Sequence, residues 1–177
     1  MKNKTKKTVY LLITLAIMVF IFVQSALPDY MSTEESNPFV VFIASVLEKT
    51  TTATVNRELI SFLVRKTAHF LEYTVLGVSL YLTFGEFLKS KREAGQRPEP
   101  QKVRNFQILS IVIPFLIGIL YAATDEFHQL FVPGRFGSVK DVLIDGAGVL
   151  AGILIIRGIL RKRNLSLNNR RENGIII

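Results

Sequence analysis

The residues from Phe106 to Gln129 read FQILSIVIPFLIGILYAATDEFHQ, and this stretch decides the fold. Its first part, up to Thr124, has no charged side chain and is long enough to cross a hydrocarbon core of about 30 Å as a helix, which takes about 20 residues. Charges follow immediately, with Asp125 and Glu126. We therefore predict a membrane-spanning helix that carries acidic side chains to one membrane surface.

Three further stretches are apolar enough to span a membrane, at residues 9–27, 59–84 and 139–160, beside the one at 106–124. The 177 residues are 49% hydrophobic with a mean hydropathy of +0.35, which is too apolar for an ordinary soluble domain. We predict one all-α domain over residues 1–177, an integral membrane four-helix bundle. The second and fourth spans contain charged residues, and charges inside a span need an explanation.

The orientation follows from the basic residues, because cytoplasmic flanks carry an excess of Lys and Arg. Most of the 22 Lys and Arg residues lie before Thr8, in the loop after the second span, or from Arg157 onwards. Four spans place these three segments on the same side. Both termini are therefore expected in the cytoplasm of a multi-pass plasma-membrane protein.

The first span has a second interpretation, because a basic start and an apolar stretch before Val23 and Ser25 also resemble a secretory signal peptide. We favour a retained helix, since Gln24 and Pro28 make a poor cleavage context.

Between the first two spans, residues 37–49 read NPFVVFIASVLEK. The apolar run is too short to cross the membrane. We predict a short interfacial or re-entrant helix on the outer face.

The second span carries polar residues along one face. Arg65, His69 and Glu72 are spaced i, i+4 and i+7, with Lys66 on the adjacent stripe. At about 1.5 Å per residue, these residues belong to the outer third of the span.

The third and fourth spans meet at the same surface. The connection FVPGRFGS, residues 131–138, contains a Pro-Gly turn and carries Arg135 back towards the helices. Asp141 and Asp145, at i and i+4, share one face of the fourth span. We expect eleven ionisable side chains to meet in one layer near the outer surface: Arg65, Lys66, His69, Glu72, Asp125, Glu126, His128, Arg135, Lys140, Asp141 and Asp145.

Three blocks in these regions, RKTAHFLEYTVLG (65–77), DEFHQLFVPGR (125–135) and SVKDVLIDGAG (138–148), strongly resemble the VanZ-like membrane proteins in order and spacing. The resemblance extends from Ile60 to Gly152. It implies a bacterial plasma-membrane protein similar to the one associated with resistance to teicoplanin-type lipoglycopeptide antibiotics. Asp145 stands where the family more often has Asn, so the local charge balance of this chain differs.

The polar layer admits three functional hypotheses. The first is a binding site at the outer leaflet for an anionic amphiphile, such as a phospholipid, a polyprenyl phosphate or a lipoglycopeptide. Arg65 and Arg135 would hold phosphate or carboxylate as planar forks, with Lys66 and Lys140 as point charges. The second is a structural ion-pair network, since ionisable groups in membranes must pair.

The third hypothesis is an enzyme, a hydrolase or transferase acting on a lipid headgroup. His69 with Glu72, and Asp125 with His128, are both i, i+3 pairs, which could bind a metal or perform acid–base chemistry. No particular cofactor is indicated. The absence of cysteine excludes thiolate ligands and disulfides.

Two other features have simpler interpretations. The net charge of +8 does not indicate nucleic-acid binding, because the basic residues flank apolar runs and form no mixed basic and aromatic stripe. Gly148 and Gly152 form a G-x-x-x-G pattern, which marks close helix approach more often than a ligand site and is weak support for dimerisation.

Overall fold

The structure, a computed structural model, describes residues 2–50, 54–93 and 100–172. Every regular element in these ranges is an α-helix, so the predicted all-α class is confirmed. The five helices are α1 (Lys2–Ser25), α2 (Asp29–Thr50), α3 (Arg57–Glu93), α4 (Pro100–Gln129) and α5 (Val139–Glu172).

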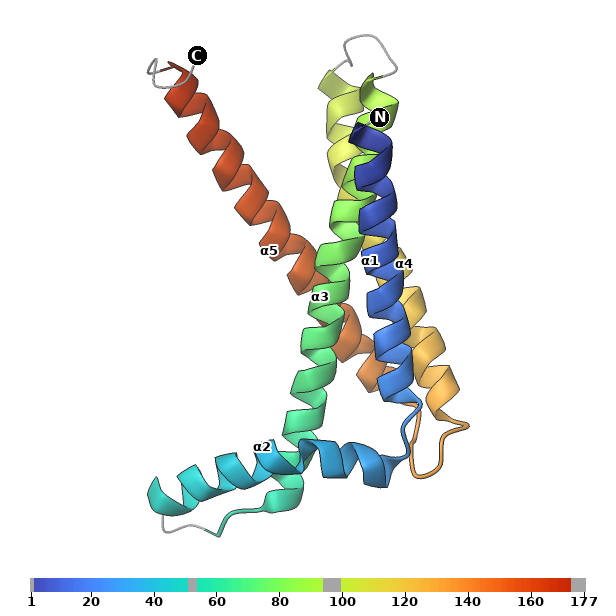
Figure 1. Ribbon diagram of the computed structural model, residues 1–177, viewed down its shortest axis with the longest axis vertical. Helices are drawn as coiled ribbons and strands as arrows, with labels where there is room; N and C mark the ends of the chain where they lie inside the picture. The colour runs from blue at the N-terminus through green and yellow to red at the C-terminus, as the bar shows by residue number, and fades with distance from the viewer. Residues whose placement is uncertain (1, 51–53, 94–99, 173–177) are drawn as a thin grey trace.

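The central element is α3, which contacts all four other helices. With 37 residues it is about 55 Å long at about 1.5 Å per residue. Figure 1 shows α1 and α4 alongside α3, α5 crossing it, and α2 lying across one end of the molecule. Both termini lie at the other end.

Three helices in the described part of the chain are long and apolar enough to cross a membrane: Thr5–Ser25, Phe106–Gln129 and Val139–Leu167. They correspond to three of the four predicted spans. The predicted span 59–84 lies within α3 but is not among them, because polar residues such as His69 and Glu72 interrupt its apolar sequence. Large apolar side chains are exposed along α1, α4 and α5, as expected for surfaces that face lipid.

Four of the described helices, α1, α3, α4 and α5, pack around a core of buried side chains. It consists of Ile21 from α1, Tyr73, Leu76 and Leu80 from α3, Ala122 from α4, and Val149 and Ile153 from α5.

The backbones of α5 and α3 approach each other closely at the G-x-x-x-G pattern. A Cβ atom added to Gly152 would lie 2.0 Å from the carbonyl oxygen of Thr74, and one added to Gly148 would lie 2.5 Å from that of Phe70. Small residues permit such backbone contact between membrane helices. The pattern therefore packs within the chain, against α3.

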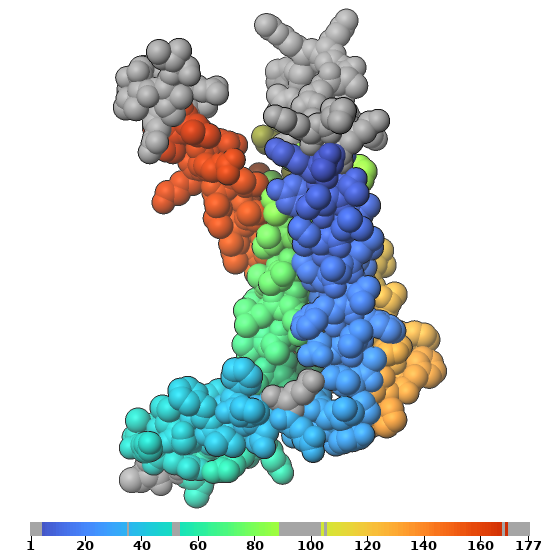
Figure 2. All heavy atoms as spheres, viewed as in Figure 1, coloured from blue at the N-terminus to red at the C-terminus, as the bar shows by residue number. Residues whose placement is uncertain are grey.

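The helix between the first two predicted spans begins earlier than predicted, at Asp29 instead of Asn37. The apolar run at residues 37–49 indicated only the second half of this helix. The backbone N–H groups of Met31 and Ser32 donate to the carbonyl of Pro28, and an acidic residue in the first turn favours the helix dipole. Further along, α2 packs on α3 through Val40, Ala44 and Ile60. Figure 2 shows α2, in cyan, projecting from the rest of the molecule.

Candidate functional site

A cavity of about 150 Å³ lies where α2, α3, α4, α5 and the α4–α5 loop meet, at the end of the molecule crossed by α2. Seven of the eleven side chains predicted to meet line this cavity: Arg65, Lys66, His69, Glu126, Arg135, Asp141 and Asp145. Other lining residues are Asp29, Phe62, Gln129, Gly134 and Phe136. Residues from distant parts of the sequence therefore form one strongly charged site.

The two cations of α3 have carboxylate partners on neighbouring helices. Arg65 forms an ion pair with Asp29 of α2 and also donates to Oγ1 of Thr33, 3.2 Å away. The Nζ atom of Lys66 lies 2.6 Å from Oδ2 of Asp141 on α5. Both pairs are only partly exposed, so they tie α3 to α2 and α5 while also lining the cavity.

Arg135 is bound differently. Gly134, with a φ of +78°, makes the turn that precedes it, a conformation that glycine adopts readily. The guanidinium then reaches the end of α1, where Nε donates to the carbonyl of Leu27 at 2.9 Å and Nη2 to that of Gln24 at 3.3 Å. None of the ion pairs in the described ranges includes Arg135.

The charge of Arg135 is therefore held by neutral carbonyl oxygens. Burial lowers the pKa of its guanidinium, and the negative charge of Asp29 opposes that shift. Arginine stays protonated in proteins, so the group remains a cation.

Glu126 and Gln129 of α4 fix the loop that carries Arg135. Oε2 of Glu126 accepts the backbone N–H of Ser138 at 2.8 Å, at the start of α5. The amide of Gln129 donates to Oε1 of Glu126 at 3.2 Å and to Oδ2 of Asp125 at 3.4 Å. Glu126 thus binds the end of the loop to α4, and Gln129 holds the carboxylate of Glu126 in place.

Asp125 does not line the cavity, and it links α4 to α1. Its side chain is 2% exposed, and its Oδ2 accepts the hydroxyl proton of Ser25 at 2.7 Å. The hydroxyl of Tyr121, one turn earlier on α4, donates to the carbonyl of Met18, two turns earlier on α1. The end of α1 is therefore part of the framework of the site.

Three other predicted residues also lie outside the cavity. Glu72 lines an apolar groove between α1 and α3, because it points to the side of α3 that α1 covers. The ring of His128 lies against Phe22, with 4.5 Å between the ring centroids. Lys140 is exposed at the start of α5.

The four candidate metal or acid–base residues are consequently divided. His69 lines the cavity, Asp125 lies behind it, Glu72 faces the α1–α3 groove and His128 contacts Phe22. Within the described ranges, no three His, Asp or Glu side chains converge in a way that could hold a metal ion.

Asp145 lines the cavity and is 1% exposed. Its Oδ2 has no hydrogen-bond partner among the described residues. A buried carboxyl oxygen in this position can accept a hydrogen bond, or donate one when protonated, to a group placed in the cavity.

Sequence reasoning missed two residues of the cavity. Asp29 directly follows the first span, on the side where the other charges gather, and this position was the available signal. Gln129 stands i+3 from Glu126 and i+4 from Asp125, so it shares a helix face with them.

Comparison with known protein families gives a match over most of the chain. The sequence model of the VanZ/LLP1 family matches residues 8–161, a segment that begins in α1, ends in α5 and includes every residue that lines the charged cavity. A search of curated proteins found no match, and neither did a search of solved structures. The chain is a membrane protein of the VanZ/LLP1 family, as its three sequence blocks predicted.

Proposed function

We propose that this protein crosses the bacterial plasma membrane four times as one domain, with α3 as the additional span and both termini in the cytoplasm. After Glu72, the sequence of α3 is uncharged as far as Gly85, and the helix lies beside α1 and α4. The two termini lie at the same end, where the basic flanks also gather (Figure 1). Because such flanks stay in the cytoplasm, the charged cavity would face the outer surface.

The position of α2 supports the same orientation. This helix lies across the end that holds the cavity and exposes Phe39, Phe42 and Val46. A helix with apolar residues exposed on one side is stable in the plane of a membrane interface. We infer that α2 lies in the outer interface.

In this setting, the cavity binds the anionic group of an amphiphilic molecule at the outer leaflet. The observation that carries this proposal is the guanidinium of Arg135. It lies in a cavity with Arg65 and Lys66, but its hydrogen-bond partners among the described residues are carbonyl oxygens only. A planar guanidinium can donate two parallel hydrogen bonds to phosphate or carboxylate. An anion in the cavity would therefore complete the charge balance around Arg135.

The rim of the cavity supports an amphiphile over a small soluble anion. Phe136 lines the cavity and is 85% exposed, and Phe131 on the same loop and Val139 at the start of α5 are also highly exposed. A cationic site beside exposed apolar side chains suits a ligand with an anionic group and an acyl chain.

Outer-leaflet phospholipids, polyprenyl phosphates and lipoglycopeptides share this chemistry. Membership of the VanZ/LLP1 family favours lipoglycopeptides, so we propose that binding contributes to resistance against teicoplanin-type antibiotics.

The other two hypotheses account for less of the geometry. A structural network explains Arg65 and Lys66, which have carboxylate partners, but not Arg135. An enzyme acting on a headgroup would use His69, which lines the cavity, but Glu72 and His128 point elsewhere. Binding is the function that the arrangement supports best.

The test replaces Arg135 by Gln, which removes the positive charge. A second variant, Arg135→Lys, keeps the charge but removes the planar guanidinium and its parallel N–H donors. Lys140→Gln is the matched control, because it removes one exposed positive charge close to the same loop. The measurements are the amount of folded protein in the membrane, lipoglycopeptide susceptibility, and the affinity of the purified protein for a teicoplanin-type lipoglycopeptide.

We expect Arg135→Gln to weaken binding by about 10- to 100-fold, as for loss of a charged hydrogen bond, with folded protein retained. Arg135→Lys should be intermediate, and Lys140→Gln should match the parent protein. Unchanged affinity and susceptibility in folded Arg135→Gln would overturn the proposal. Loss of folded protein in both Arg135 variants would favour the structural network instead.

A further inference from the structure

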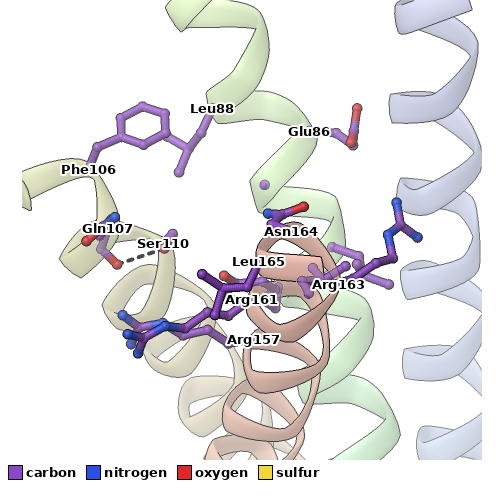
Figure 3. Close-up of a pocket in the computed structure, with 14 residues that line it drawn as sticks. Glu86, Leu88, Phe106, Gln107, Ser110, Arg157, Arg161, Arg163, Asn164 and Leu165 are labelled. Carbon is purple, nitrogen blue, oxygen red and sulfur yellow. Dashed lines mark hydrogen bonds between the residues drawn. The ribbon is translucent and has the colours of Figure 1, made fainter. Parts of the chain in front are cut away.

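A second cavity, of about 700 Å³, lies at the opposite end of the molecule, near the termini. Its walls are the second half of α5, the end of α3 and the beginning of α4 (Figure 3). Apolar side chains such as Tyr81, Leu82 and Phe106 line it, and its charged lining residues are Glu86, Arg157, Arg161 and Arg163. This cavity shares no residue with the charged cavity beside α2.

The cavity exists because α5 separates from α3 beyond their crossing. The two helices touch at Gly148 and Gly152, and α5 then diverges towards the C-terminus (Figures 1 and 2). Past the crossing, a Cβ atom added to Gly85 or to Gly158 would meet nothing within 4 Å. The space between the helices is therefore not filled by side chains of the described residues.

Two arginines lie on one face of this space. Arg157 and Arg161 are i and i+4 on α5, and in Figure 3 they point to the same side, whereas Arg163 points the other way. None of the ion pairs in the described ranges includes either of them. Ser110, whose hydroxyl donates to the carbonyl of Gln107, lines the same cavity.

Two neighbouring cations repel each other, and an anion placed between them removes this repulsion. Guanidinium forks match the oxygens of a phosphate. The apolar walls beside them suit a hydrocarbon chain, because a gap between membrane helices is accessible to lipid. Basic pockets between spans on the cytoplasmic side are a known way to hold anionic headgroups.

We propose that this cavity binds one anionic phospholipid, with its phosphate between Arg157 and Arg161 and an acyl chain against Tyr81, Leu82 and Phe106. The assignment of this lipid to the cytoplasmic leaflet rests on the orientation proposed above. The binding itself does not, and it is independent of any ligand in the cavity beside α2.

The experiment uses the full-length protein in nanodiscs of phosphatidylcholine mixed with phosphatidylglycerol. Native mass spectrometry then gives the number and kind of lipids that remain bound. The variant Arg157→Gln/Arg161→Gln tests the cationic pair. Its matched control, Arg104→Gln/Lys162→Gln, removes two exposed positive charges that do not line the cavity.

A second variant leaves the arginines in place. Gly85 lines the cavity and has open space around it, so Gly85→Leu would fill part of the volume that the acyl chain needs. This variant keeps the proposal testable if the double arginine variant does not fold.

We expect one phosphatidylglycerol per chain in the parent protein and in the control. In Arg157→Gln/Arg161→Gln, the affinity for phosphatidylglycerol should fall by at least about tenfold, which is the size expected for lost charged hydrogen bonds. The affinity should also fall in Gly85→Leu. Equal retention in all proteins, or equal loss in the control and the arginine variant, would overturn the proposal. So would displacement of the lipid by soluble glycerol phosphate, because the acyl chain would then contribute nothing. Lipoglycopeptide binding is not measured, so failure here is distinct from failure of the proposed function.

Discussion

At the scale of single residues, the ion pair between Lys66 and Asp141 joins α3 to α5 at the edge of the cavity. Removing one partner leaves a partly buried charge without its counter-ion. We expect Lys66→Met to lower the free energy of unfolding by about 1 to 3 kcal/mol, between the values for exposed and buried pairs. Unfolding of the purified protein in mixed micelles with increasing denaturing detergent measures this change.

The double variant Lys66→Met/Asp141→Leu should recover most of the lost stability, because an apolar pair of similar volume replaces a buried ion pair at little cost. Lys140→Met, at an exposed position of the same helix turn, is the control and should leave stability unchanged. If the double variant were no more stable than Lys66→Met alone, the pair would not act as a coupled unit.

For the residues of the cavity, helix periodicity predicts which of them share a face of one helix, but not which neighbouring helix that face contacts. Spacings of i and i+4 correctly placed Arg65 with His69, and Asp141 with Asp145, on the faces that line the cavity. Glu72 lies on the same side of α3 by spacing, yet it faces α1. Which neighbour covers a given stripe is decided by tertiary packing, and that information is not local in the sequence.

At the scale of helices, the crossing of α5 over α3 depends on Gly152. A methyl group there would lie 2.0 Å from the backbone oxygen of Thr74, and a backbone atom cannot move aside as a flexible side chain can. We expect Gly152→Ala to lower the free energy of unfolding by about 1 to 3 kcal/mol, as at other sites where an added methyl group overpacks a core. The measurement is thermal unfolding in detergent micelles.

Gly158 provides the matched control six residues further along α5. Its added methyl group meets nothing within 4 Å, so Gly158→Ala should be neutral or slightly stabilising, because alanine favours helix. A Gly152→Ala protein as stable as Gly158→Ala would show that α5 can cross α3 without this backbone contact.

The first helix makes a separate prediction. Ser25 binds Asp125, and the carbonyl of Gln24 binds Arg135, so loss of α1 would leave a buried carboxylate without its partner and remove one of the two carbonyls that bind Arg135. We therefore expect α1 to be retained in the mature protein. The intact mass of protein purified from membranes through a C-terminal tag measures this directly. A mass that corresponds to cleavage near Ala26 would instead favour the signal-peptide interpretation.

The helices themselves were largely predictable. Long apolar runs, uncharged in the first and third spans and charged only near the ends of the fourth, indicated the three helices that are apolar enough to cross a membrane, because the length required to cross a bilayer is a strong constraint. The early start of α2 at Asp29 was not predicted, since its first turns are polar and are held by contacts with Arg65. The divergence of α5 from α3 was equally inaccessible, because glycine patterns indicate a close contact but not the direction of the helix beyond it.

At the scale of the whole molecule, charge gathers at both ends. The end beside α2 contains the charged cavity, which is lined by both acidic and basic side chains and in which Arg65 and Lys66, but not Arg135, have carboxylate partners. The end near the termini contains the arginine pair of α5. Between them, α1 and α3 are joined by neutral hydrogen bonds, one between the hydroxyls of Thr14 and Ser79 at 2.6 Å and one between those of Thr14 and Thr83 at 2.8 Å. This distribution suits a protein that contacts the surfaces of both leaflets.

The four-span orientation can be tested on the intact molecule because the chain has no cysteine, so a single introduced thiol reports on its own position. Phe136 is 85% exposed beside the charged cavity, and Arg104 is exposed near the start of α4, at the end that holds the termini. In intact cells, or in spheroplasts where an outer membrane is present, a membrane-impermeant maleimide should label Phe136→Cys and leave Arg104→Cys unlabelled. After the membrane is opened, both should react. Labelling of Arg104→Cys alone in the intact preparation would invert the orientation and move the charged cavity to the cytoplasmic side. Labelling of both would place the two positions on the same side, which requires an even number of spans between them and would contradict a single crossing by α4.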